Sequence, residues 1–340
     1  MDTYNIYKDI NARTQGEIYI GVVGPVRSGK STFIKHFAEK LILPFMSDGA
    51  GKERAKDELP QSAAGRTVMT TEPKFIPREA CVITPAQDIS MKIRLIDCVG
   101  FMIDGATGVV EDGKERLVKT PWYDYEIPFS EAAEFGTRKV IKDHSTVGIV
   151  MTTDGSIGEL PRDSYKAAEA ATIEELKKIG KPFVVVVNSK NPAAKSATEC
   201  VDEIKKAYGA EAVSLDCEQL TLDDVNRTLE LLLNSFPING IEFYFDRWIE
   251  TLPDDNEIKQ AMVECAGQIL DRITYIKDFN KDSIKVENKY IEDVRSEPVD
   301  MADGIIRLSF KVDENLYYDM LSSIAGEKID NEYELINLIK

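Results

Sequence analysis

The sequence predicts an α/β protein, in which a P-loop NTPase domain with a doubly wound sheet is followed by a second, smaller α+β domain. Short apolar runs alternate with helical segments over residues 1–237, the order of strands and helices in such a sheet. A glycine-rich phosphate-binding motif separates the first apolar run from the first helix. Over residues 238–340 the order changes, and helices flank an alternating strand.

The first strand and the first helix have the clearest patterns. Residues 17–23 form a short apolar run, as expected for a strand buried on both faces of a parallel sheet. From Ser31 onward apolar residues recur every four positions until Pro44, which cannot continue a helix. The polar stretch at 47–67 is too long for a routine connection, so we expect a mobile functional segment there.

Four further strands and three further helices complete the predicted first domain. The strands are short apolar runs, and the helices are marked by amphipathic patterns, caps or stop signals. The strands are 91–97, 147–152, 183–188 and 212–215, and the helices are 130–143, 161–180 and 221–233. The stretch at 98–129 is expected to be irregular.

The second domain combines helices with one clear strand. Residues 304–312 place apolar side chains on one face and polar side chains on the other, which predicts a half-exposed antiparallel strand. Helical patterns cover 258–276, 314–324 and 331–339. The chain stops at Lys340 without a helix-ending signal, so we expect it to be truncated relative to a longer protein.

The charge argues against two classes of partner. Lys+Arg at 42 against Asp+Glu at 59 gives a net charge of −17, and residues 241–340 alone hold 12 bases and 23 acids, a difference of −11. Such a surface repels nucleic-acid phosphates and anionic lipid headgroups, so we expect no nucleic acid partner and no direct membrane insertion. The five cysteines form no C-x-x-C pair, so we expect no disulfide framework and no zinc site. The N-terminus has no secretory leader pattern and no stretch approaches eighteen uninterrupted apolar residues, which predicts a cytoplasmic protein.

Residues 24–31 satisfy the phosphate-loop pattern G-x-x-x-x-G-K-[ST] in full. In this motif the glycines let backbone N–H groups surround the β-phosphate, and the following helix directs its positive end at the same anion. We expect Lys30 to bridge the β- and γ-phosphates as a catalytic residue, and Ser31 to ligate Mg²⁺. The predicted nucleotide-binding residues are Gly24, Pro25, Val26, Arg27, Ser28, Gly29, Lys30, Ser31 and Thr32.

A second motif follows the strand at 91–97. Asp97 and Gly100 have the D-x-x-G spacing of phosphate-switch NTPases. In such a site the aspartate holds Mg²⁺, usually through a water, and the glycine N–H contacts the γ-phosphate. Asp97 is therefore a predicted catalytic and metal residue, and Gly100 a predicted nucleotide contact. For this pattern taken alone, an acid that ends a strand at a turn is the alternative.

Residues 65–73 contain the third predicted part of the site. Phosphate-switch proteins use a threonine whose hydroxyl completes the Mg²⁺ shell while the γ-phosphate is present. Thr70 and Thr71 are the catalytic candidates, with Thr70 also a metal ligand, and a Thr-rich strand start is the alternative. Arg66, or Arg27 in the phosphate loop, could act as an arginine finger, and a surface or positioning role is the alternative for both.

Two features of GTP-hydrolysing switches are missing. Phe101 stands where many of them place the glutamine that orients the attacking water, so we expect hydrolysis to position water otherwise and to be slow. The valine-rich strand is followed by Asn188-Ser189-Lys190-Asn191 instead of N-K-x-D. Asn191 offers a neutral amide where a guanine site has a carboxylate, so ATP is the predicted nucleotide.

An aromatic cluster lies in the stretch that is expected to be irregular. It consists of Trp122, Tyr123 and Tyr125. Two interpretations stay open, a local mini-core and a partner surface that changes with the nucleotide state.

Six segments are distinctive in combination: GPVRSGKST, GRTVMTTEPKFIP, RLIDCVGF, KTPWYDYEIPFSEAAEFGTRKVI, DHSTVGIVMTTDGSI and KPFVVVVNS. Together they resemble the stage IV sporulation protein A family, the ATPase that builds the basal layer of the bacterial spore coat. The resemblance runs from about residue 4 to about residue 235 and includes segments outside the phosphate loop. Residues 238–340 are compatible with the family but carry fewer distinctive motifs.

The resemblance implies a fold related to translation-factor-like GTPases that has turned to ATP. It implies Mg²⁺-dependent ATP hydrolysis that drives irreversible self-assembly, with Lys30 at the phosphates, Asp97 at the magnesium, and Thr70 and Thr71 sensing the γ-phosphate. The implied location is the mother-cell cytoplasm at the outer forespore surface. The implied partners are further copies of the chain, other spore coat proteins, and a small amphipathic membrane-anchoring peptide contacted by a C-terminal region beyond this chain.

A polymerising ATPase is thus the leading prediction. A GTP-dependent switch that recruits partners without polymerising is the alternative from a different class. A nucleotide-binding scaffold without catalysis, suggested by Phe101, is the third.

Overall fold

The computed structural model describes residues 5–47, 49–60, 72–86, 88–103, 110–111 and 114–340. Its contacts divide the chain into two compact units, Met1–Phe236 and Pro237–Lys340. Each unit has its own sheet and its own apolar core. Among the described helices, none combines the length and the apolar composition that crossing a bilayer requires.

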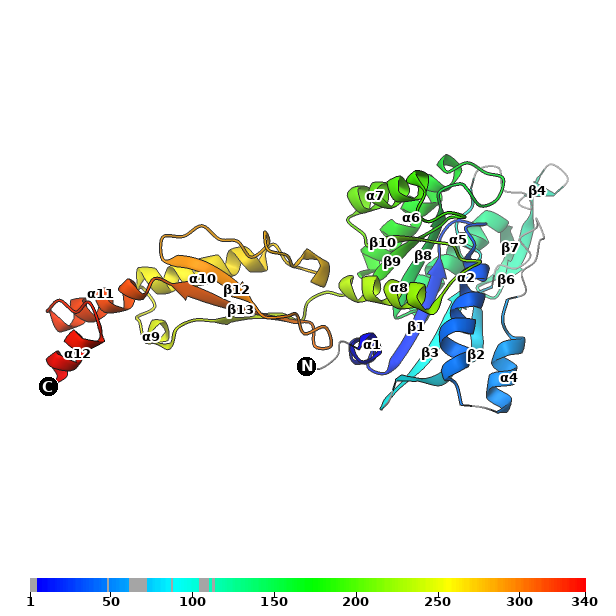
Figure 1. Cartoon of the computed structure of the whole chain (residues 1–340). Helices are drawn as coiled ribbons and strands as arrows, with labels where there is room; N and C mark the ends of the chain where they lie inside the picture. Colours follow the sequence, from blue (N-terminus) through cyan, green and yellow to red (C-terminus); the bar gives the residue numbers. More distant parts are fainter. Residues whose placement is uncertain (1–4, 48, 61–71, 87, 104–109, 112–113) are drawn as a thin grey trace. The chain divides into compact units, whose positions relative to one another are not determined.

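A six-stranded sheet organises the first unit, in the order β10-β9-β8-β1-β3-β2 (Figure 1). All neighbouring pairs run parallel except β2 and β3, which are antiparallel. The strands are β1 (Glu17–Val23), β2 (Lys74–Ala86), β3 (Ile89–Asp97), β8 (Val147–Thr153), β9 (Phe183–Asn188) and β10 (Ala212–Leu215). The predicted α/β class with a parallel-strand sheet is confirmed, and the five predicted strands are all present.

Helices lie on both faces of this sheet. Side chains of η2, α6 and α7 share one buried cluster with the strands, whereas α1, α2 and α8 contact β3, β1 and β9 respectively. The helical elements are α1 (Ile6–Arg13), α2 (Lys30–Phe37), η1 (Ala38–Ile42), α3 (Leu43–Phe45), α4 (Ala50–Asp57), α5 (Phe129–Lys139), η2 (Val140–His144), α6 (Asp163–Ile179), α7 (Lys195–Tyr208) and α8 (Leu222–Asn234). The helices predicted from Ser31, at 130–143, at 161–180 and at 221–233 are confirmed.

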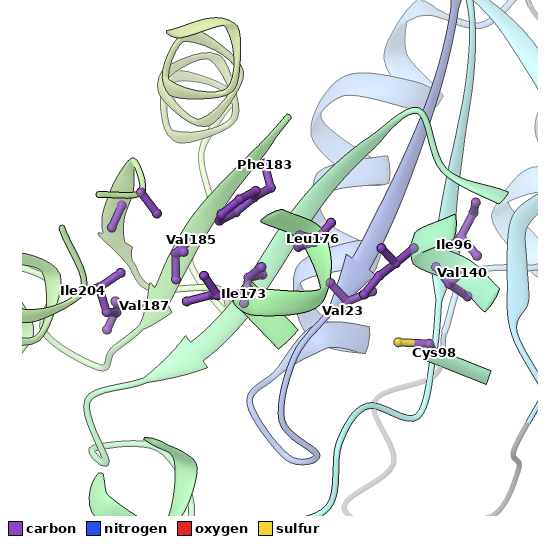
Figure 2. Close-up of a cluster of buried hydrophobic side chains, with 14 of the residues drawn as sticks. Val23, Ile96, Cys98, Val140, Ile173, Leu176, Phe183, Val185, Val187 and Ile204 are labelled. Carbon is purple, nitrogen blue, oxygen red and sulfur yellow. The ribbon is translucent and has the colours of Figure 1, made fainter. Parts of the chain in front are cut away.

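Figure 2 shows the buried cluster on the face covered by α6. Val23 of β1, Ile96 of β3 and Val187 of β9 meet Ile173 and Leu176 of α6 there, and all five side chains are fully buried. Val23 ends β1 and Ile96 is the residue before the end of β3. Close packing at these positions fixes the carboxyl ends of the strands, the edge at which open α/β sheets bind ligands.

Outside the stretches expected to be irregular, β2, α1 and α7 are not predicted by the sequence. The pattern of β2 is interrupted by Pro77 and Pro85, which lack the N–H of a central strand but are tolerated on an edge strand such as β2. Helix α1 buries only Ile6 and Ile10. Helix α7 is mostly charged and polar, so its apolar stripe is short.

Two predicted irregular stretches contain regular structure. Within 47–67, α4 forms a helix whose one buried residue is Ala55, too little to give an apolar pattern, and residues 61–67 lie outside the described part. Within 98–129, β6 (Leu117–Thr120) pairs with β7 (Tyr123–Pro128), and short strands β4 (Val110–Glu111) and β5 (Lys114–Glu115) also pair. The prediction of a long irregular stretch was therefore wrong for the hairpin.

The aromatic cluster lies on this hairpin, where the ring centroid of Tyr125 is 5.4 Å from that of Tyr123. The ring centroids of Trp122 and Tyr123 lie 5.2 and 5.4 Å from that of Phe135 on α5. Tyr125 is 63% exposed. Trp122 and Tyr123 therefore pack on Phe135 and are partly buried, as in a local mini-core, while Tyr125 is exposed. The interpretation as a partner surface stays open.

The second unit contains a three-stranded sheet in the order β11-β13-β12. Strand β13 is antiparallel to β12, as predicted, but parallel to β11. Its alternate residues Ile306, Leu308, Phe310 and Val312 are buried in one cluster with Met262, Cys265 and Ile269 of α10. The elements are β11 (Gly240–Tyr244), α9 (Arg247–Glu250), α10 (Glu257–Leu270), η3 (Ile276–Asp278), β12 (Ile291–Ser296), β13 (Ile305–Val312), α11 (Glu314–Ala325) and α12 (Glu332–Ile339).

Candidate nucleotide-binding site

The loop between β1 and α2 has a shape that only glycine allows at two positions. Gly24 has a φ of 125°, and a Cβ there would lie 2.2 Å from the carbonyl oxygen of Met151. Gly29 has a φ of 92°, and its Cβ would lie 2.2 Å from Nδ2 of Asn188. Both positions combine left-handed backbone with close approach, so the two glycines of the motif are required by geometry.

Lys30 is the first residue of α2 and is buried, with 6% of its surface exposed. Its Nζ donates hydrogen bonds to the carbonyl oxygens of Pro25 at 2.6 Å and Gly24 at 3.3 Å. Burial lowers the pKa of Lys30, against the opposing effects of Cys98 and Asp97. An ammonium desolvated in this way gains strongly from an anionic ligand, as a phosphate would be.

The remaining loop residues brace its backbone. Ser28 is buried and donates through Oγ to the carbonyl oxygen of Pro25 at 2.9 Å, and Val26 N–H donates to the carbonyl oxygen of Phe101 at 3.0 Å. Arg27 has a φ of 60°, which costs a non-glycine residue about 1–3 kcal/mol and persists where the surrounding structure imposes it. The hydrogen bond within the loop and the hydrogen bond to Phe101 thus both stabilise one conformation of the loop.

Asp97 and Ser31 meet at the carboxyl end of β3. Ser31 Oγ donates to Oδ2 of Asp97 at 2.8 Å. The other carboxylate oxygen, Oδ1, is buried and has no hydrogen-bond partner among the described residues. Burial raises the pKa of Asp97, and the Lys30 ammonium opposes this rise. A buried, unpaired carboxylate oxygen beside a serine hydroxyl is the donor set that Mg²⁺ takes in phosphate-binding sites, so the residues present fit that ion.

Gly100 packs directly on the phosphate loop. A Cβ at this position would lie 2.0 Å from the carbonyl oxygen of Gly24 and 2.6 Å from Nζ of Lys30, and the φ of Gly100 is 95°. The D-x-x-G turn therefore touches both the loop and its lysine.

Replacing Gly100 by alanine is expected to lower phosphate release from ATP by about tenfold or more, because the backbone oxygen of Gly24 must move to admit the methyl group. Gly51→Ala is the matched control, since a Cβ at Gly51 would meet nothing within 4 Å. Equal phosphate release by Gly100→Ala and Gly51→Ala would contradict this geometry.

Phe101 lies in an apolar cluster and not among the polar residues of the site. Its side chain is 8% exposed and is buried with Val26, Tyr165 and Ala168. Its backbone pairs with Pro25 in a parallel bridge. The residue that replaces a water-orienting glutamine thus anchors the D-x-x-G turn to the phosphate loop.

The structure brings most of the predicted site residues together. Residues 24–32 form the phosphate loop and the first turn of α2, with Thr32 partly buried on that turn, and Asp97 and Gly100 contact them. Thr70, Thr71 and Arg66 lie outside the described residues. Their roles therefore stay predictions.

Comparison with known proteins decides the family. Residues 1–237 match the family described as Stage IV sporulation protein A, ATPase domain, and residues 238–340 match its middle domain. The chain is 40% identical over 337 residues to Stage IV sporulation protein A of Clostridioides difficile (strain 630), covering 98% of this chain and 68% of the relative. The chain belongs to the stage IV sporulation protein A family.

The relatives named Stage IV sporulation protein A from Bacillus anthracis and Bacillus subtilis (strain 168) are each 38% identical, covering 100% of this chain and 69% of their own length. The predicted resemblance is confirmed, and the phosphate loop lies in the family's ATPase domain. A solved structure described as the SsGBP and GDP complex is 15% identical with a TM-score of 0.36, covering 63% of this chain and 49% of that one. That likeness is too slight to add to the assignment.

In this member of the stage IV sporulation protein A family, Asn188 ties the end of β9 to the phosphate loop. Its Nδ2 donates to the carbonyl oxygen of Ser28 at 3.2 Å, and its Oδ1 accepts from the N–H of Cys217 at 3.2 Å. The side chain is 5% exposed. Sequence reasoning treats Asn188 only as part of an incomplete guanine motif and misses this positioning role. The available signal was a polar residue at the carboxyl end of a buried parallel strand.

Proposed function

We propose that this chain is a Mg²⁺-dependent ATP hydrolase, and that hydrolysis of ATP drives its self-assembly into the basal layer of the bacterial spore coat. The observation that carries the hydrolase part is the convergence of Lys30, Ser31 and Asp97 beside a glycine-shaped phosphate loop. Membership of the stage IV sporulation protein A family supports the sporulation role.

The residues of the loop bind and orient the triphosphate. Gly29, which precedes α2, gives the helix no side-chain cap, so the first N–H groups of α2 are suited to an anion held in the loop. The buried ammonium of Lys30 places a positive charge where water is excluded, so it stabilises charge that develops on the phosphate oxygens. A phosphate partner also favours the charged form of this lysine, whose pKa burial lowers.

Asp97 and Ser31 are the residues that would hold Mg²⁺, with Thr70 proposed as a further ligand and Thr71 as its companion in γ-phosphate sensing. The fit rests on the buried oxygen Oδ1 of Asp97, which has no hydrogen bond among the described residues. When bound, the ion would supply positive charge that stabilises the negative charge developing on the phosphate oxygens.

Hydrolysis at this site is proposed to be slow. The ring of Phe101 is buried among apolar side chains and has no polar atom with which to orient water. The burial of Phe101 is also the observation that favours a nucleotide-binding scaffold without catalysis.

The proposed setting is the mother-cell cytoplasm at the outer forespore surface. The proposed partners are further copies of this chain, other spore coat proteins, and a small amphipathic membrane-anchoring peptide. The net charge of −17 supports attachment through such a peptide, because an acidic surface is repelled by anionic lipid.

Side-by-side phosphate release from ATP and GTP, with Mg²⁺, tests the proposed chemistry. We expect release from ATP above the no-enzyme blank and a clear preference for ATP over GTP. A preference for GTP would favour the switch protein, and release at the level of the blank with both nucleotides would favour the scaffold.

A further inference from the structure

A hydrogen-bond cluster centred on Asp154 lies at the same edge of the sheet and has no part in the chemistry described so far. Asp154 follows β8 and Ser189 follows β9, two neighbouring parallel strands. Oδ1 of Asp154 accepts from the N–H of Ser156 at 2.9 Å and from its Oγ at 2.6 Å. Oδ2 accepts from Oγ of Ser189 at 2.8 Å and of Ser196 at 3.1 Å. Both carboxylate oxygens are therefore engaged by donors.

The same hydroxyls hold the backbone that follows β9. The N–H of Lys190 donates to Oγ of Ser156 at 3.0 Å, and the N–H of Asn191 donates to Oγ of Ser189 at 3.2 Å. A serine hydroxyl has one hydrogen, and here it points to Asp154, so the oxygen is left to accept from the backbone. Asp154 thus fixes two successive N–H groups through two serines.

The ionised state of Asp154 sets this direction of the hydrogen bonds. Burial acts to raise the pKa of Asp154, but hydrogen bonds from Ser156, Ser189 and Ser196 outweigh burial, and the pKa lies below its ordinary value. An ionised carboxylate only accepts, so both serines must donate to it. A neutral amide in its place would replace one accepting oxygen by a donating NH2 group, so the hydrogen bonds on that side would have to reverse.

This cluster adjoins the phosphate loop. Asn188 donates to the carbonyl oxygen of Ser28 in that loop at 3.2 Å. The Cδ1 atom of Ile157 would lie 3.7 Å from a Cβ placed on Gly29. The segments 154–157 and 188–191 therefore adjoin the phosphate loop through Ile157 and Asn188, at the edge where open α/β sheets bind ligands.

We propose that Asp154 is a positioning residue that holds residues 190–191, through Ser156 and Ser189, so that the amide of Asn191 meets the base of ATP and selects adenine. This inference rests on the proposed function, because it names how the same site chooses its nucleotide. Asn191 is exposed, and it lies three residues after Asn188, whose side chain donates a hydrogen bond to the carbonyl oxygen of Ser28.

The chemistry of the two purines explains the selection. Adenine presents a donor, the 6-amino group, beside an acceptor, N1, and one amide can satisfy both. Guanine presents two neighbouring donors, N1–H and the 2-amino group, which need a carboxylate that accepts both. Asp154 is a carboxylate close to this loop, but its oxygens already accept from Ser156, Ser189 and Ser196. Guanine is therefore left with an unmatched donor, which is costly in a desolvated site.

Calorimetric titration of the whole chain with ATP, GTP and inorganic tripolyphosphate, each with Mg²⁺, tests the proposal. Asp154→Asn and Ser156→Ala are expected to weaken ATP binding about tenfold, and to leave tripolyphosphate binding unchanged because the phosphate loop is intact. Ser156→Thr keeps the hydroxyl and is expected to keep the affinity of the wild type for ATP. In the same variants the KM for ATP should rise more than kcat falls.

A gain of guanine binding is the complementary test. Asn191→Asp is expected to move the ratio of ATP affinity to GTP affinity at least about tenfold toward GTP, because a carboxylate accepts both guanine donors. An unchanged ratio in Asn191→Asp, or an equal loss of ATP and tripolyphosphate binding in Ser156→Ala, would overturn the proposal. If Asp154→Asn does not fold, the pair Ser156→Ala and Ser156→Thr decides alone. Failure of the wild-type chain to bind ATP would instead contradict the proposed function itself.

Discussion

Replacing Lys30 by alanine is expected to reduce phosphate release from ATP by about a hundredfold or more. The ammonium of Lys30 is buried against the carbonyl oxygens of Gly24 and Pro25, and Gly100 closes the same space. Alanine removes this buried positive charge from the phosphate loop. Release of phosphate from ATP by the purified variant measures the effect.

The control for this variant is Lys40→Ala. Lys40 lies on η1, which continues α2, and its side chain is exposed. The Lys40→Ala variant loses the same charge from the same helical segment but leaves the phosphate loop unchanged. Its rate of phosphate release should therefore match that of the wild type. If Lys30→Ala released phosphate as fast as Lys40→Ala, the assignment of Lys30 to the phosphate site would be contradicted.

Replacing Asp97 by asparagine is expected to raise the Mg²⁺ concentration needed for half-maximal hydrolysis by about 10–100-fold, and to lower the maximal rate. Asparagine can still accept the hydrogen bond from Ser31, so the fold around the site should persist. It replaces the buried oxygen Oδ1 or its partner by an amide nitrogen and removes the negative charge that favours a cation. A titration of phosphate release against Mg²⁺ measures both effects, and chelation of Mg²⁺ should abolish release by the wild type.

Asp57→Asn supplies the comparison for Asp97→Asn. Asp57 is an exposed residue of α4, so the substitution makes the same chemical change away from the site. It should leave the Mg²⁺ dependence of the wild type unchanged. A Mg²⁺ curve of Asp97→Asn that coincides with that of Asp57→Asn would show that Asp97 does not hold the ion.

Much of the first unit is predictable because its elements repeat a local pattern. A buried parallel strand is a short apolar run wherever it occurs, so β1, β8 and β9 can be recognised without knowledge of their neighbours. The edge strand β2 and the hairpin of β6 and β7 have mixed composition, and their pairing depends on partners elsewhere in the chain. Those elements were missed for that reason.

The residues of the site also fall into those that the sequence predicts and those that only the fold brings together. The phosphate loop is contiguous, so its glycines and Lys30 follow from spacing alone. The contact between Asn188 and Ser28 joins residues 160 positions apart, and that between Ser189 and Asp154 joins residues 35 positions apart. Such pairs become visible only when the order of the strands brings their loops to one edge.

Sedimentation of the purified chain after incubation with ATP and Mg²⁺ tests most directly whether nucleotide hydrolysis at this site drives assembly. The wild type should pellet with ATP and stay in the supernatant without nucleotide. Lys30→Ala and the double variant Thr70→Ala/Thr71→Ala should stay in the supernatant under both conditions, while Lys40→Ala should pellet like the wild type. Equal pelleting of the wild type and Lys30→Ala, or of the wild type with and without ATP, would contradict the account.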